Sequence, residues 1–68
     1  MANAALREFV RTQAEDRPGV YRWLGRDGRI LYVGKSIRIK TRLLSYFRAE
    51  RDKVARMVGE AVDVSWDY

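Results

Sequence analysis

PGVYRWLGRDGRILYVGK, residues 18–35, is the stretch that decides the fold of this chain. Residues 19–24 and 29–34 are rich in β-branched and aromatic side chains, which favour β-strands. Between them, Gly25-Arg26-Asp27-Gly28 has the composition of a tight turn. We therefore expect an antiparallel hairpin here, with the rest of the chain organised around it.

The side chains of the predicted hairpin divide between two faces. Because strand side chains alternate, Tyr21, Trp23 and Tyr32 share one face. A turn centred on residues 26–27 places Tyr21 opposite Tyr32, and a turn centred on residues 27–28 places Trp23 there instead; the sequence leaves both registers open. We expect helices to pack on the opposite face, which carries Val20, Leu24, Leu31 and Val33.

Helical and strand patterns flank the hairpin. Apolar residues recur at helical spacing in residues 4–14, 37–47 and 53–61, and they alternate with polar residues in residues 62–67. The order helix, strand, strand, helix, helix, strand predicts one α+β domain with a three-stranded antiparallel sheet flanked by helices. The expected helix N-caps are Asn3, Ser36 and Asp52.

The composition limits the chemistry that the chain can perform. It has no cysteine and no histidine, which excludes disulfides, thiolate metal sites and the commonest general base. Acid–base chemistry would have to use Tyr, Lys, Asp or Glu. No apolar run approaches the ~20 residues of a membrane span, and no signal peptide opens the chain. We therefore expect a cytoplasmic domain without a membrane partner.

Positive charge is concentrated around the hairpin. The net charge is +5, and residues 22–56 alone carry eleven lysines and arginines against three acidic residues. A basic surface of this kind attracts polyanions, above all nucleic acid. The alternative is a solvated surface that keeps a small domain soluble.

A second basic pattern follows the hairpin. Arg38, Arg42 and Tyr46 recur every fourth residue, on a different face of the predicted helix from its apolar stripe. Cleavage of a phosphodiester needs a base, cations for the phosphate oxygens, and a metal or acid for the leaving oxygen. A phenol, with a reference pKa near ~10, serves as the base only where cations favour phenolate. The alternatives are ordinary strand aromatics and a solvated helix face.

These residues carry a family resemblance. Gly19-Val20-Tyr21 and Tyr32-Val33-Gly34, with Pro18 before the first tripeptide, resemble the two signature tripeptides of the GIY-YIG nuclease superfamily. Lys35, Arg42 and Ser45-Tyr46 fit the same pattern, most closely that of the UvrC-type excinuclease domain. The resemblance covers residues 17–68, and the helix over residues 4–14 precedes it.

The resemblance implies a function and a site. It implies hydrolysis of DNA with one divalent metal, Mg²⁺ or Mn²⁺, in nucleotide excision repair, with damaged duplex DNA and other excision-repair proteins as partners. One of the tyrosines would be the general base. The catalytic positions that it implies are Tyr21, Tyr32, Lys35, Arg42 and Tyr46. We expect Arg38 and Lys40 to contact the DNA backbone.

One expected part of the site is missing. In the family, the metal ligand is a glutamate on a helix that follows the third strand, and this sequence has no residue there. Glu60, Asp63 and Asp67 belong to other elements. We therefore expect a domain that lacks the family's final helix, holds no metal ligand and cuts weakly or not at all by itself. A sheet face left bare would favour self-association. The alternative function is a basic module that binds nucleic acid without cutting it.

Overall fold

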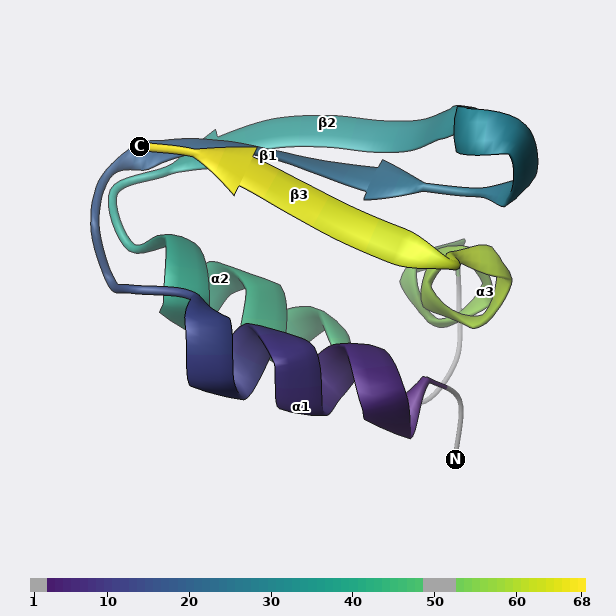
Figure 1. Ribbon diagram of the computed structural model, residues 1–68, viewed down its shortest axis with the longest axis horizontal. Helices are drawn as coiled ribbons and strands as arrows, with labels where there is room; N and C mark the ends of the chain where they lie inside the picture. Colours follow the sequence, from purple (N-terminus) through teal and green to yellow (C-terminus); the bar gives the residue numbers. More distant parts are fainter. Residues whose placement is uncertain (1–2, 49–52) are drawn as a thin grey trace.

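The computed structural model describes residues 3–48 and 53–68, in which one antiparallel sheet lies over a layer of helices (Figure 1). The predicted α+β class is confirmed. The strands lie in the order β2-β1-β3. The elements are α1 (Ala4–Gln13), β1 (Gly19–Leu24), the short 3₁₀ turn η1 (Arg26–Gly28), β2 (Ile30–Ser36), α2 (Ile39–Tyr46), α3 (Lys53–Glu60) and β3 (Asp63–Asp67). The expected cap Asp52 lies outside the described residues.

The hairpin adopts the second of the two registers. Trp23 lies opposite Tyr32, and Tyr21 lies opposite Gly34. The turn is closed by Asp27 and Gly28, whose φ angles of 59° and 73° are in the left-handed region that aspartate and glycine tolerate best. The register shifts by one residue after Trp23, and Leu31, left without a paired residue, packs against the core.

The helices cover the aromatic face of the sheet, not the face with the valines. Tyr21 and Trp23 are 3% and 0% exposed, whereas Val20 and Val33 remain 41% and 49% exposed. The expectation that helices pack on the valine face is therefore wrong. Aromatic rings bury more apolar area than valines do, so turning them toward the helices removes more surface from water. Figure 1 shows α1, α2 and α3 on this one side.

The core joins this aromatic face to each helix. Ile39 and Leu43 of α2 are fully buried, as is Val10 of α1. Gly19 allows β1 to approach β3, because a Cβ at this position would collide with the carbonyl oxygen of Asp67. In the part of the chain that the structure describes, no helix is both long and apolar enough to cross a membrane.

Two of the expected caps act differently from the prediction. Asn3 occupies the N-cap position of α1, but its side chain makes no capping bond there. Its amide instead donates to the carbonyl oxygens of Val58 and, at 3.0 Å, of Ala61, so it ties the end of α3 to the start of α1. Ser36 accepts a hydrogen bond from the amide of Arg38 at 2.9 Å and so shapes the turn before α2, which begins at Ile39.

The start of α2 is capped from a distant part of the chain. Asp16, in the connection between α1 and β1, accepts hydrogen bonds from the amide and the hydroxyl of Thr41, both at 2.7 Å. The Ile39 amide donates to the carbonyl of Arg17 at 3.1 Å. The first amides of a helix lack partners within it, so Asp16 satisfies one of them. The same connection therefore fixes both β1 and the helix that carries Arg42.

Replacing Asp16 by alanine should lower the melting temperature at neutral pH, because the cap on α2 is lost. The bonds from Thr41 hold the pKa of the Asp16 carboxyl below its ordinary value. The cap therefore stabilises the fold above the ordinary aspartate pKa and is lost as pH falls through the lowered value. Melting curves followed by circular dichroism should show the two proteins converging in acid. Glu15→Ala, a change in the same connection, serves as the control; an equal loss for it would refute the capping role.

Candidate active site

Tyrosines from three elements meet between the sheet and α2. Tyr21 on β1, Tyr32 on β2 and Tyr46 on α2 form what we call the tyrosine cluster. The hydroxyls of Tyr21 and Tyr46 are hydrogen-bonded at 2.7 Å. The ring centroid of Tyr32 lies 6.2 Å from that of Tyr21 and 6.3 Å from that of Tyr46. The predicted shared face of Tyr21 and Tyr32 is confirmed, and α2 turns Tyr46 toward it.

Gly34 makes room for this cluster. It is paired with Tyr21, and a Cβ built on it would lie 2.6 Å from the Tyr21 hydroxyl oxygen and 3.0 Å from Cε2 of Tyr32. A glycine inside a strand often marks such a close approach. The sequence predicted a strand over residues 29–34, whereas β2 continues to Ser36 and Gly34 lies inside it.

The tyrosines of the cluster differ in environment. Burial raises the pKa of Tyr46 strongly, and so do its hydrogen bond with Tyr21 and the neighbouring phenols, while Arg42 opposes the shift. Tyr46 therefore stays protonated at neutral pH and acts as a hydrogen-bonding partner. Tyr21 is 3% exposed, whereas Tyr32 is 48% exposed. A ligand arriving from solvent thus meets the phenol of Tyr32 first.

The arginines expected on α2 lie beside the cluster. Arg42 precedes Tyr46 by one helical turn, and its side chain is exposed. Arg38 and Arg42 line one hollow of about 280 Å³, together with Ser36, Ile37, Thr41 and Ser45. Two guanidinium groups with hydroxyls between them suit a phosphate, which arginine binds through paired hydrogen bonds.

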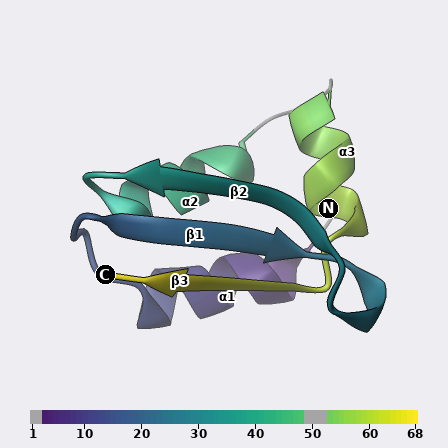
Figure 2. The same cartoon turned by 90° about the horizontal axis from the view of Figure 1, so that it is seen from above.

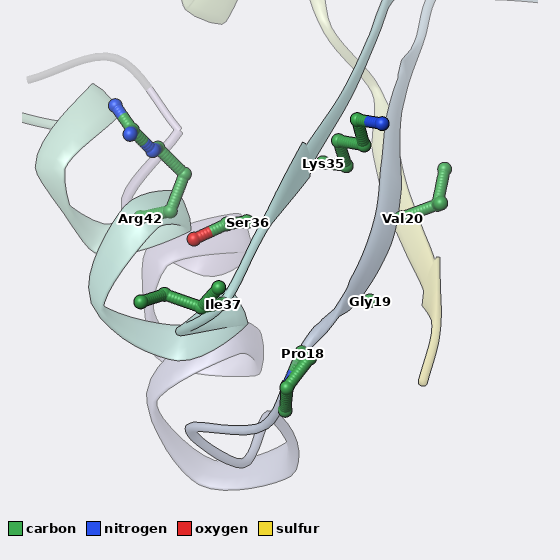
Figure 3. Close-up of a pocket in the computed structure, with 7 residues that line it drawn as sticks. All are labelled: Pro18, Gly19, Val20, Lys35, Ser36, Ile37 and Arg42. Atoms are coloured by element: carbon green, nitrogen blue, oxygen red, sulfur yellow. The ribbon is translucent and has the colours of Figure 1, made fainter.

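Lys35 does not join the tyrosine cluster. Gly34 faces Tyr21, so the next residue of the strand points to the opposite face of the sheet. Figure 3 shows Lys35 and Val20 directed away from α2, with Arg42 on the helix side. Lys35 and Arg42 nevertheless line the same open hollow, of about 640 Å³, at the end of the sheet. A polyanion that lies across this end of the sheet can therefore contact both Lys35 and Arg42.

Lys40 lies elsewhere on α2. It is half-buried, and its charge acts on the carboxyl of Asp16. It lines neither of the hollows that contain Arg42. The structure thus brings Arg38, but not Lys40, into a hollow with Arg42, although the charges of Arg38 and Lys40 both act on the Asp16 carboxyl.

The described residues gather no cluster of acidic side chains. Within residues 3–48 and 53–68, no group of three or more acidic side chains could hold an ion. The hollows around Arg42 have no acidic residue in their lining. Asp67 is paired with Arg22, and Asp16 is engaged by Thr41. Mg²⁺ prefers carboxylate and water oxygens, so phenols and cations alone do not fit it.

The three-stranded antiparallel sheet with its helices is the fold that the resemblance to the GIY-YIG class predicted. The family model described as the UvrC-like GIY-YIG domain matches residues 17–67. The chain therefore belongs to the family of UvrC-like GIY-YIG domains.

Relatives support this assignment at the level of sequence and structure. The UvrABC system protein C of Desulforudis audaxviator is 50% identical over 50 residues, which are 72% of this chain and 8% of that protein. That of Aromatoleum aromaticum is 45% identical over 60 residues, 85% of this chain and 10% of that protein. The chain thus spans about a tenth of the length of these curated relatives.

A solved structure shares the fold closely. The GIY-YIG N-terminal endonuclease domain of UvrC from Thermotoga maritima, bound to its catalytic divalent cation magnesium, matches with a TM-score of 0.82 and 31% identity. The match covers 96% of this chain and 71% of that one. The relative holds a divalent cation, and within residues 3–48 and 53–68 of this chain no three acidic side chains gather into a group.

Proposed function

We propose that this domain hydrolyses a phosphodiester bond of DNA, as the nuclease module of an excision-repair endonuclease that works with partner proteins of that pathway. The observation that carries the proposal is the tyrosine cluster with Arg42 beside it. The fold shared with a metal-bound UvrC endonuclease domain supports it.

In this proposal each residue of the site has a separate role. Arg42 binds the oxygens of the scissile phosphate and stabilises the charge that grows on them during cleavage. Tyr32, the exposed tyrosine, acts in its phenolate form: it orients the attacking water and accepts its proton. Tyr21 and Tyr46, joined by their hydroxyls, hold the cluster in place. Arg38 and Lys35 contact the DNA on either side of the cleaved bond.

The divalent metal, Mg²⁺ or Mn²⁺, would neutralise the leaving oxygen in this reaction. Its carboxylate ligand has to come from outside the described residues, because these bring no carboxylate to the hollows around Arg42. We therefore expect the 68-residue chain to cut DNA weakly or not at all by itself.

A plasmid-nicking assay tests this expectation. The chain is compared, in Mg²⁺ and in Mn²⁺, with a fusion that continues past Tyr68 with the corresponding segment of the Thermotoga maritima domain. We expect the fusion to nick supercoiled DNA and the chain to leave it intact. Nicking by the chain alone, abolished by Tyr32→Phe, would refute the need for an outside carboxylate. A fusion that binds DNA but never nicks it would refute the proposed hydrolysis.

The second candidate function, binding without cutting, rests on the exposed hollow of Arg38 and Arg42. Binding of this kind should weaken steeply with salt and show little preference for sequence. Arg38→Ala should reduce the slope of log affinity against log salt by about 1, as expected for one lost phosphate contact. Fluorescence anisotropy with labelled duplexes measures the slope. Arg7→Ala, which removes the same charge from α1, should leave it almost unchanged; equal effects would show that only net charge matters.

A further inference from the structure

A third hollow adjoins the tyrosine cluster at the C-terminal end of α2. Its volume is about 340 Å³, within the ~300–1,000 Å³ range of small-ligand sites. It lies between β2, the C-terminal end of α2 and α3. Figure 2 shows α3 beside the β2 edge of the sheet, beyond the end of α2. The residues that line it are Leu31, Tyr32, Tyr46, Lys53, Val54 and Met57.

The lining of this hollow differs in chemistry from the phosphate site. Apart from the two phenols and one ammonium group, it is built from aliphatic side chains and contains no acidic residue. Tyr32, a residue that is 48% exposed, forms one wall. Burying a bare phosphate here would leave most of its oxygens without partners. A flat, largely apolar ring, in contrast, can stack on an aromatic face and pack against the methyl groups of this lining.

The hollow of Arg38 and Arg42 and the apolar hollow are separated by a distance that a single nucleotide can span. Arg42 and Tyr46 are four residues apart on α2, a rise of about 6 Å along the helix. Arg42 lines the phosphate site, and Tyr46 lines the apolar hollow. A phosphate held by Arg42 therefore brings the attached sugar and base to the level of Tyr46. Lys53, exposed at the rim, adds a positive charge for the next phosphate along the strand.

We propose that this apolar hollow is a nucleobase subsite: it takes the base of a nucleotide adjoining the phosphate bound at Arg42, stacked on Tyr32 and packed against Met57. The inference rests on the proposed function, because it requires a phosphodiester at Arg42. It adds to that function a contact that reads a base and holds the strand in place for the reaction.

Nuclear magnetic resonance on the whole chain tests the subsite directly. The probes are the thymidine dinucleotide TpT, the two analogues in which one base is replaced by an abasic residue, and inorganic phosphate. The chain has two methionines, Met1 and Met57, so the methyl signal of Met57 is assigned with Met57→Leu. We expect TpT to shift the Met57 methyl and the Tyr32 ring signals upfield, because a stacked base lies above them. Phosphate should shift only signals around Arg42.

Affinities supply the second readout. Removing the base that occupies the hollow should weaken binding roughly 10-fold, as expected for one base stacked on an aromatic ring. In Met57→Gln, which keeps the length and the helix preference of the side chain, the difference between TpT and the abasic analogue should fall below about 3-fold. Met57→Leu should retain the full difference. Val54→Thr, a smaller polar change in the same lining, provides a second test if Met57→Gln melts at a lower temperature.

The outcomes separate the subsite from the proposed function. Shifts around Arg42 with TpT, an unmoved Met57 methyl and equal affinity for the abasic analogues would overturn the subsite and leave the phosphate site standing. No shift around Arg42 with any probe at millimolar concentration would count against both. A base effect that is equally large in wild type and Met57→Gln would place the base elsewhere and also overturn the inference.

Discussion

Replacing Arg42 by alanine should reduce nicking by the extended domain, which is the fusion that continues past Tyr68, by about 100- to 1,000-fold. This is the loss typical for one charge-stabilising donor in a preorganised site. Arg42 lines the hollow at the start of β1 and the hollow at the start of α2, and it stands one turn from Tyr46. Its guanidinium is the cation best placed to hold a phosphate next to the tyrosine cluster. The rate of conversion of supercoiled to nicked plasmid measures the effect.

The matched control is Arg26→Ala. Arg26 lies in η1, beyond the other end of β1, and its removal lowers the net charge equally. We expect this control to retain most of the nicking rate. Because Arg42 is exposed, its loss should leave the melting temperature nearly unchanged. Equal losses of nicking in the two variants would mean that the basic charge as a whole, and not a phosphate contact at Arg42, determines activity.

Gly34→Ala should damage both the fold and the site. The new methyl group would lie 2.6 Å from the Tyr21 hydroxyl oxygen, which is held between β2 and Tyr46. Relief requires Tyr21 to move, which breaks its bond with Tyr46 and displaces the ring of Tyr32. Overpacking of this kind destabilises by about 1–3 kcal/mol. Urea unfolding measures this loss, and the nicking rate of the extended domain should fall with it.

Gly59→Ala is the matched control for this change. Gly59 lies in α3, and a Cβ there would meet nothing within 4 Å. Alanine should stabilise this helix by roughly 0.5 kcal/mol, because glycine is the poorer helix former. If Gly34→Ala were as stable as wild type, with the Tyr21–Tyr46 bond intact, the view that Gly34 makes room for the cluster would be wrong.

The hairpin shows how far the sequence determined the fold. Period-two alternation was enough to place Tyr21, Trp23 and Tyr32 on one face, whichever residues formed the turn. The register itself depended on the left-handed backbone at Asp27 and on the shift after Trp23, which alternation alone does not reveal. The face that the helices cover depends on the apolar area that each face can bury. The aromatic rings bury more area than the valines, so the helices cover the aromatic face.

Long-range side-chain bonds were the part that local patterns could not supply. Asn3 had the right residue type for a cap, but its partners lie 55 and 58 residues away, one within α3 and one just after it. Asp16 caps α2 from 25 residues earlier in the chain. Capping preferences are local rules. They identify residues that can hydrogen-bond to the end of a helix, but they do not show which helix each residue will cap.

The candidate site was predictable in its residue types more than in its geometry. The spacing of Arg38, Arg42 and Tyr46 predicted a basic helix face; in the structure Arg38 and Arg42 line one hollow, although Arg38 precedes α2. It did not show that Tyr46 would bond to Tyr21, nor that Lys35 would point to the opposite face. The bond between Tyr21 and Tyr46 depends on the angle between α2 and the sheet. The direction of Lys35 depends on Gly34 facing the cluster.

The most direct test of the central claim is the nicking rate of the extended domain with Tyr32→Phe. This change removes one exposed hydroxyl and keeps the ring that forms a wall of the apolar hollow. If Tyr32 handles the proton of the attacking water, nicking should fall by at least about 100-fold, while DNA affinity and melting temperature stay the same. Wild-type nicking by Tyr32→Phe would contradict the assignment of Tyr32 as the reacting phenol of the cluster.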